Sequence, residues 1–431
     1  MSTDAIYKAD VDSTTITTAE SRKAIAAGVW GTVVEWYDYA VYGFLATIIA
    51  QHFFPSADDT TALLSAFAAF GLGFVARPLG GIAIGWLGDA RGRKTALVLT
   101  LFLMAVSTVG IGLLPTYASI GVAAPVLLVV CRLVQGFSAG GEWGGSTAFI
   151  VEWAPSNRRG LFGSLQQASV AGGLLIGSGV AAIVASILMP EQMSDWGWRI
   201  PFLLGGILLP LGMYIRRNVE DTPAFRAVQE QNEKPREMPW RAAGQAFGFT
   251  ILWTVSFYIM LSYMPTFTQK YAGLSRTEAL WSNTIGLVAV VIAIPLMGRI
   301  SDRVGRKPLI LASVVSFLVL SYPLFSLMLA YGNFAAAVVV QIIFGLMLAS
   351  FSGPGPAAIA EIFPTNGRST WMSTAYSLSV AIFGGFAPYI ATWLISATGS
   401  PLAPTFYLMI AAAISTLVVL TLRETAHSKL M

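Results

Sequence analysis

Two stretches of sequence, GWLGDARGRK at residues 85–94 and GRISDRVGRK at residues 298–307, decide the fold. Both follow the pattern Gly-x-x-x-Asp-x-x-Gly-Arg-Lys, and they begin 213 residues apart. A second pattern, Glu-x-x-Pro-x-Asn-x-Arg, occurs at residues 152–159 and again at residues 361–368, which is 209 residues later. Two motifs that recur in the same order at nearly the same interval predict a chain made of two similar halves.

The composition predicts that both halves lie in a membrane. Of the 431 residues, 55% are hydrophobic and 11% are charged, whereas about 25% are charged in a typical soluble domain. So few charges cannot cover a surface that faces water. A helix needs about 20 mainly apolar residues to span a bilayer. Twelve segments meet this requirement, at residues 26–50, 61–88, 95–115, 124–152, 160–188, 199–215, 244–270, 279–300, 308–329, 335–362, 370–397 and 403–423.

Lysine and arginine are distributed unevenly between the predicted loops. Basic residues gather in the cytoplasmic loops of membrane proteins, and 21 of the 26 lie on the cytoplasmic side if both termini are placed there. Only Lys270 and Arg276 lie in the opposite loops. We therefore expect a multi-pass protein of the cell (inner) membrane. Its expected parts are a cytoplasmic N-terminal tail (1–25), an N-terminal six-helix bundle (26–215), a central cytoplasmic loop (216–243), a C-terminal six-helix bundle (244–423) and a cytoplasmic tail (424–431).

Several classes of function are excluded by what the sequence contains. Cys131 is the sole cysteine and His52 and His427 are the only histidines, so no cluster of metal ligands is present. The basic residues are dispersed over short loops, which argues against nucleic-acid binding. The sequence has no GxxxxGK[ST] loop and no visible nucleophile–base pair, so we expect neither an ATP-driven pump nor an enzyme. We expect no cofactor, a lipid bilayer as the environment and a monomer.

The repeated loops resemble the signature of the major facilitator superfamily. Five further motifs resemble those of its metabolite:proton symporter family: EWYD (35–38), RPLGG (77–81), RLVQG with GGE (132–136 and 140–142), WGWRIPF (196–202) and FGG (383–385). The resemblance covers nearly the whole chain. It implies an all-α integral membrane fold, the major facilitator fold, with twelve transmembrane helices in two six-helix bundles. EDTPAF (220–225) and YMP (263–265) resemble the proline/betaine branch of that family, whereas Arg132 resembles the branch of the α-ketoglutarate permease.

Five charged residues lie within predicted spans of the first half: Glu35, Asp38, Arg77, Arg132 and Glu142. Charge inside a bilayer is costly and usually serves function. At a rise of about 1.5 Å per residue, all of them except Arg132 lie at one level near the bilayer centre. Three carboxylates against one arginine cannot all be ionised cheaply. Asp38, Glu35 and Glu142 are therefore our candidates for proton coupling, and the alternative is a structural ion-pair network.

Substrate binding and gating are assigned to two further sets of residues. The candidate substrate-binding residues are Arg77, Arg132, Tyr39, Tyr42, Gln135, Trp253, Tyr258, Tyr263, Gln341 and Tyr376. We expect most of the tryptophans and tyrosines to be anchors at the membrane interfaces rather than parts of a ligand cage. The family resemblance implies that the repeated loops hold the cytoplasmic side closed. That role falls on Gly85, Asp89, Arg93, Asp302 and Arg306, although the basic residues are also explained by topology alone.

These features together predict a secondary active transporter that works by alternating access. The leading hypothesis is proton-coupled symport, with protons as the coupling ion, that imports a small carboxylate-bearing metabolite such as a dicarboxylate, a tricarboxylate or another organic acid. A proton symporter of an osmolyte such as proline or betaine is the first alternative. The second alternative is a facilitator without proton coupling, against which the cluster of carboxylates argues.

Overall fold

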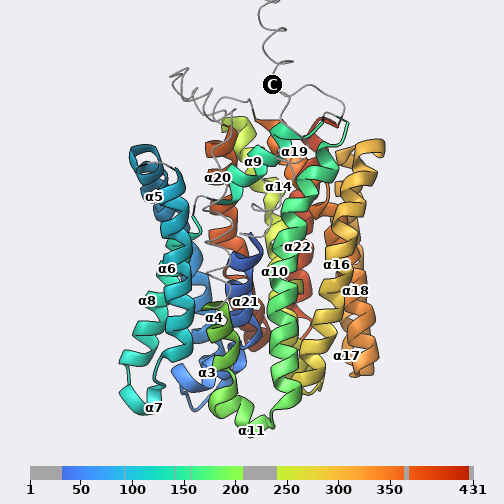
Figure 1. Cartoon of the computed structure of the whole chain (residues 1–431). Coiled ribbons are helices and arrows are strands. Elements are labelled where there is room, and N and C mark those ends of the chain that lie inside the picture. Colours follow the sequence, from blue (N-terminus) through green and yellow to red (C-terminus); the bar gives the residue numbers. More distant parts are fainter. Residues whose placement is uncertain are drawn as a thin grey trace, which may run out of the picture.

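The computed structural model describes residues 32–91, 93–140, 142–155, 157–206, 240–363 and 368–426. Within these ranges the chain is helical and contains no strand. Most helices run side by side along one direction (Figure 1). The expected N-terminal tail and nearly all of the expected central loop lie outside the described residues, as do residues 427–431 of the expected C-terminal tail.

Within the described residues, each of the six predicted spans of the first half contains helix; residues 26–31 of the first span and 207–215 of the sixth lie outside those residues. The first is a helix over residues 32–44 that continues, after a turn at Leu45, as α3 (Ala46–Phe53). The others are α4 (Asp59–Val75) with α5 (Arg77–Arg91), α6 (Arg93–Leu113), α8 (Ala123–Ser138) with α9 (Glu142–Trp153), α10 (Arg159–Ile187), and residues 199–206. Three short elements connect them: α7 (Tyr117–Ile120), α11 (Pro190–Gln192) and the π-helical turn η1 (Met193–Gly197).

The six predicted spans of the second half are also helical. They are α14 (Trp240–Tyr258) with η2 (Ile259–Tyr263) and α15 (Met264–Tyr271); α16 (Arg276–Val304); α17 (Arg306–Tyr331); α18 (Phe334–Ser352) with α19 (Gly355–Ile362); α20 (Arg368–Ser379) with η3 (Val380–Gly384) and α21 (Ala387–Thr398); and α22 (Ala403–Thr421). Local sequence explains several ends. Ser275 and Glu278 form a capping box at the start of α16, and Gly332, with φ of 52°, ends α17 in the left-handed conformation.

The lengths and the outer surface of the helices fit a bilayer. Eight described helical segments are long and apolar enough to cross a membrane, and two shorter apolar helices accompany them. Large apolar side chains such as Leu79, Ile82 and Leu417 are mostly exposed on the outside of the helices. In a protein with so few charges, this apolar surface faces lipid.

In the first half, α8 approaches α4 and α5 closely because glycines lie at the contact. A Cβ atom on Gly136 of α8 would lie 1.5 Å from the carbonyl oxygen of Gly73, and one on Gly80 would lie 1.7 Å from that of Phe137. A Cβ on Gly140 would lie 2.0 Å from the carbonyl oxygen of Arg77. Only glycine permits backbones to pack at this distance. This contact brings Arg77 of α5 and Arg132 of α8 close to each other.

The two halves meet along several helix pairs. The most extensive contact joins α10 to α16, and α9 packs on α20 while α4 packs on α21. The ends of the bundle differ: α5, α9, α19 and α20 reach one end, where the label C lies, and α7 and α11 lie at the other (Figure 1). We call the first the motif end, because both repeated loops lie there, and the second the far end.

Candidate functional site

The first charged pair of the site joins the helix over residues 32–44 to α5. Arg77 Nη2 lies 3.5 Å from Glu35 Oε1, and both side chains are buried. The Arg77 guanidinium also lies against the rings of Trp36, Tyr39 and Phe74, at 5.6, 5.1 and 5.0 Å from their centres. Arginine is held in this way by electrostatic attraction to the ring faces. Two of the charged residues predicted near the bilayer centre, Glu35 and Arg77, therefore form an ion pair that is surrounded by aromatic rings.

Arg132 is the second buried cation, and it differs from Arg77 in its partners. Its side chain is completely buried. It donates to Gln135 Oε1 (2.8 Å) and to the carbonyl oxygen of Phe70 (3.4 Å), and its guanidinium lies 4.5 Å from the ring centre of Tyr42. Within the described part of the chain it forms no ion pair with a carboxylate. A buried cation that no carboxylate contacts directly is costly, so this position attracts an anionic group.

Asp38 lies close to the hydrogen-bonded chain that begins at Arg132. Gln135 Nε2 donates to Thr108 Oγ1 (2.7 Å). A Cβ atom on Gly205 would lie 2.9 Å from Asp38 Oδ1 and 3.0 Å from the Thr108 methyl group, so both side chains meet at that glycine. Asp38 is 3% exposed, and its Oδ1 has no hydrogen-bond partner among the described residues. An ionised carboxylate in such surroundings is destabilised, and binding a proton removes the buried charge.

Aromatic side chains from both halves surround these charges. Tyr258 of α14 contacts Phe74 with ring centres 5.1 Å apart and Trp36 with ring centres 6.3 Å apart. Nearer the motif end, Trp143 stacks on Tyr376 at 3.7 Å, and Trp253 contacts both rings. Trp36 and Trp143, which are not among the predicted site residues, are buried here rather than exposed at a membrane interface.

The sequence contained a signal for these missed aromatic residues. Trp36 lies inside the EWYD motif, Trp143 directly follows the GGE motif, and Phe74 precedes Arg77 by three residues. Residues next to intramembrane charges on a helix share their level in the bilayer, so each was a candidate by position alone.

Three predicted substrate residues make contacts that hold helices together. The Tyr42 hydroxyl donates to the carbonyl oxygen of Ala66 (2.9 Å), which joins the first span to α4. Gln341 Nε2 donates to Ser282 Oγ (2.9 Å) and joins α18 to α16. Tyr263 OH accepts from Thr392 Oγ1 (3.3 Å) and joins η2 to α21. Of these three, Tyr42 also lies against a charged group of the site, the guanidinium of Arg132.

The predicted gating residues of the second half bridge the two halves at the motif end. Asp302 accepts hydrogen bonds from the backbone N–H groups of Gly160 (2.8 Å) and Leu161 (2.9 Å) at the start of α10. Arg306 Nη1 lies 2.7 Å from Asp302, and its Nη2 lies 3.5 Å from Glu361. The side chains of Asp89, Arg93 and Glu142 lie outside the described residues, as does the surrounding of Gly85.

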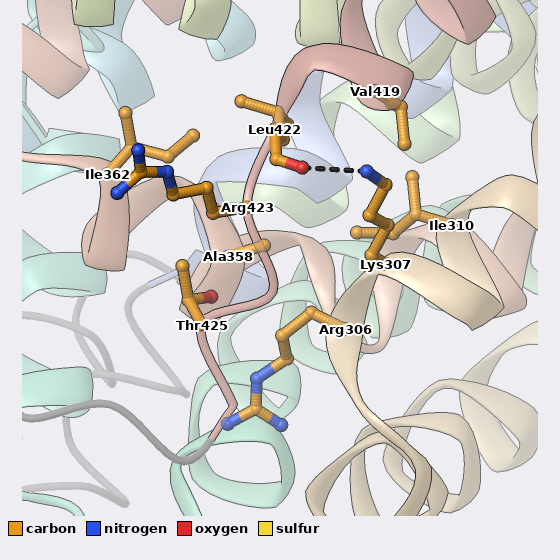
Figure 2. A pocket seen from close by; sticks show the side chains of 9 residues that line it. All are labelled: Arg306, Lys307, Ile310, Ala358, Ile362, Val419, Leu422, Arg423 and Thr425. Atoms are coloured by element: carbon orange, nitrogen blue, oxygen red, sulfur yellow. Dashed lines mark hydrogen bonds between the residues drawn. The ribbon is translucent and has the colours of Figure 1, made fainter.

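A short segment after α22 packs beside this bridge. The Glu424 carboxylate accepts from the backbone N–H groups of Arg306 (2.9 Å) and Lys307 (3.0 Å) at the start of α17. Partial burial opposes its charge, but these backbone donors and those of Thr425 and Ala426 outweigh it and hold the pKa of Glu424 below its usual value of 4.5. Lys307 Nζ donates to the carbonyl oxygen of Leu422 (2.7 Å) across a small pocket (Figure 2).

Contacts between the halves occur at the far end as well. Ser178 and Thr284 share a hydrogen bond of 2.8 Å between α10 and α16. Trp281 Nε1 donates to Ser186 Oγ (3.0 Å) on the same helix pair. The two halves are therefore in contact at both ends of the bundle, and the buried charges lie between those contacts.

Comparison with known proteins identifies the family. A family model described as "Sugar (and other) transporter" matches residues 23–245, and one described as "Major Facilitator Superfamily" matches residues 269–430. The chain belongs to the major facilitator superfamily. Its members are transporters rather than enzymes, so the resemblance seen in the motifs is confirmed. Among the described residues no group of three or more His, Cys, Asp or Glu side chains is placed to hold a metal ion.

Individual transporters are similar to this chain in sequence or in structure. The chain is 34% identical to the proline/betaine transporter of Escherichia coli (strain K12), over 97% of this chain and 87% of that protein. It is also 34% identical to the glycine betaine/proline/ectoine/pipecolic acid transporter OusA of Dickeya dadantii, over 97% of this chain and 86% of that protein. The solved proton:xylose symporter XylE matches with a TM-score of 0.78 at 18% identity, over 96% of this chain and 98% of that one. This likeness confirms the fold of a multi-pass membrane protein.

Proposed function

We propose that this protein is a proton-coupled symporter that imports a small zwitterionic osmolyte, with glycine betaine and proline as the leading substrates. The observation that carries the proposal is the completely buried Arg132 guanidinium, which has no carboxylate partner among the described residues. One unpaired cation matches the single carboxylate of such a substrate. Two relatives at 34% identity over nearly the whole chain are named as transporters of these compounds, which supports the same substrate class.

The charge balance favours a zwitterion over the di- and tricarboxylates that led the sequence-based hypothesis. A second carboxylate group needs a second cation, but Arg77 is already neutralised by Glu35 at 3.5 Å. The neighbouring rings of Trp36, Tyr39 and Phe74 present negative faces, which attract an ammonium group and repel additional anionic charge. The site can therefore bind one anionic group, and its aromatic rings can bind a cationic group.

Asp38 is our candidate for the coupling proton. When it is ionised, its negative charge competes with the substrate carboxylate for the field of Arg132, to which Thr108 and Gln135 connect it. Protonation removes this competition, so proton binding and substrate binding favour each other. A zwitterion is neutral overall, and cotransport with one proton moves one positive charge inward. The membrane potential then contributes about 2.3 kcal/mol per 100 mV to uptake.

Transport is proposed to proceed by alternating access between the bundles over residues 26–215 and 244–423. The excess of lysine and arginine around the repeated loops supports a cytoplasmic location of the motif end. The Asp302 bridge then closes the cytoplasmic side, and its release opens that side when the substrate is delivered.

Uptake into proteoliposomes tests the function. Radiolabelled glycine betaine, proline and α-ketoglutarate are supplied with and without an inward proton gradient, at a potential clamped by valinomycin and potassium. We expect gradient-dependent accumulation of glycine betaine or proline and no accumulation of α-ketoglutarate. Gradient-driven uptake of α-ketoglutarate alone supports the organic-acid transporter instead, and uptake that ignores the gradient supports the facilitator.

A further inference from the structure

In the Glu35–Arg77 pair, one negative and one positive group lie next to each other, as the two charges of a zwitterion do. A carboxylate and a guanidinium lie 3.5 Å apart, which is longer than the 2.7–2.9 Å of a tight charged hydrogen bond. Three aromatic rings enclose the cationic partner, with Trp36 and Tyr39 from the same helix as Glu35, and Phe74 from α4. This set, Glu35 with Trp36, Tyr39 and Phe74, is called the cation cage below.

Unused polar groups border the cation cage. Tyr258 of the second half contacts Trp36 and Phe74, yet its buried hydroxyl group has no hydrogen-bond partner within the described part of the chain. Arg77 Nε is likewise buried without a partner there. Buried polar atoms in proteins nearly always have a hydrogen-bond partner. Neighbouring atoms without one are therefore candidates to bind a polar ligand. Here they lie where the two halves of the protein meet.

The second arginine is close to the same rings. The guanidinium carbons of Arg77 and Arg132 each lie 5.1 Å from the ring centre of Tyr39. A carboxylate near Tyr39 is thus within the field of both cations. An ammonium group bonded to that carboxylate through one or two carbon atoms reaches the neighbouring cage, because the charges of glycine betaine or proline are separated by so short a link.

We propose that the substrate inserts into the Glu35–Arg77 pair, so that its ammonium group takes the place of the Arg77 guanidinium in the cation cage and its carboxylate is shared by Arg77 and Arg132. This inference rests on the proposed function and specifies how the substrate is held. Each charge of the pair exchanges one opposite partner for another. The exchange is therefore electrically balanced for a zwitterion. It is unbalanced for a plain anion or a plain cation, which leaves Glu35 or Arg77 without a partner.

The test is a binding comparison between three compounds of similar shape. Glycine betaine is the zwitterion, 3,3-dimethylbutanoate replaces its quaternary nitrogen by carbon, and choline lacks the carboxylate. Equilibrium binding to the purified full-length protein is measured at one fixed pH, so that all three compounds are compared without a proton gradient. We expect the wild type to bind glycine betaine at least tenfold more tightly than 3,3-dimethylbutanoate, which corresponds to about 1.4 kcal/mol.

The variants Glu35→Gln and Trp36→Leu should bind glycine betaine more weakly. The ratio of its affinity to that of 3,3-dimethylbutanoate should then fall toward one. Trp36→Phe retains a ring and should keep a larger part of the preference, and Trp393→Leu on the half-exposed surface of α21 is the matched control. Thermal unfolding verifies that each variant is folded. If Glu35→Gln and Trp36→Leu still prefer glycine betaine to 3,3-dimethylbutanoate as the wild type does, the ammonium group does not bind in the cation cage. The proposed function is not affected by that result. A wild type that binds neither glycine betaine nor proline overturns the proposed function.

Discussion

Asp302, in the second half of the chain, accepts a 2.8 Å hydrogen bond from the backbone N–H of Gly160 in the first half. The N–H of Leu161 bonds to the other carboxylate oxygen at 2.9 Å. The start of a helix carries partial positive charge, so a carboxylate placed there is stabilised. This bridge crosses the boundary between the two bundles at the motif end, and it must break for the bundles to separate there.

Asp302→Asn should therefore shift the protein toward a conformation that is open at the motif end. The loss of charge at the helix start is worth roughly 1–2 kcal/mol, or roughly a tenfold change in the ratio of the two conformations. Distances between spin labels at Asn157 and Arg303, in a Cys131→Ala background, report the separation. Asp59→Asn at the exposed start of α4 is the control. Unchanged distance distributions in Asp302→Asn contradict a gating role.

Asp38→Asn should uncouple transport from protons while leaving exchange intact. Asparagine cannot bind the proton, but it removes the buried charge that competes for Arg132. We expect gradient-driven accumulation of substrate to fall at least tenfold, and exchange of labelled for unlabelled substrate to persist. Both rates are measured in the same proteoliposomes. If accumulation still follows the proton gradient in this variant, Glu35 or Glu142 becomes the candidate for the coupling site.

Arg132→Gln should weaken the binding of every substrate that carries a carboxylate. Hydrogen bonds to charged groups contribute about 1.5–3 kcal/mol each, so we expect KM to rise by roughly one to two orders of magnitude. Arg132→Lys keeps the charge and should recover part of the loss. Competition by choline, which lacks a carboxylate, should change little. A similar loss for choline and glycine betaine indicates that Arg132 supports the fold rather than the substrate.

Gly136→Ala should destabilise the first bundle. The added Cβ would lie 1.5 Å from the carbonyl oxygen of Gly73, so the backbones of α4 and α8 must move apart. Overpacking of this kind costs roughly 1–3 kcal/mol and should lower the midpoint of thermal unfolding in detergent. Gly244→Ala in α14 is the matched control, since its added Cβ would point into open space. Equal midpoints for the two variants contradict the close helix contact.

Glu424→Gln should remove a pH-dependent contribution to stability. Because the pKa of Glu424 is lowered in the folded protein, the contribution is complete above pH 4.5 and is lost as the pH falls through the lowered value. The group is partly exposed, so solvent screening limits the effect to about 0.5–1 kcal/mol. The unfolding midpoint of the wild type should exceed that of the variant at pH 7 and approach it as the pH falls below the lowered pKa of Glu424. Glu191→Gln in α11 is the control.

The sequence alone determined the membrane location, the twelve helical segments and the repeat of the two halves. Each depends on local properties: the length of an apolar run, the charge of a loop and the spacing of a motif. The recurrence of GWLGDARGRK as GRISDRVGRK is visible without any coordinates. The intramembrane charges were also identifiable, since a charged residue inside a long apolar run is conspicuous.

Only the tertiary structure decided how those charges are partnered. Glu35 pairs with Arg77, which is 42 residues away, whereas Arg132 lies against Phe70 and Tyr42 and finds no carboxylate in the described chain. The rings of Trp36, Phe74 and Tyr258 come together from three helices of both halves. Partners so distant in sequence are chosen by the rotation and close approach of packed helices, which glycines such as Gly136 permit and which no local pattern encodes.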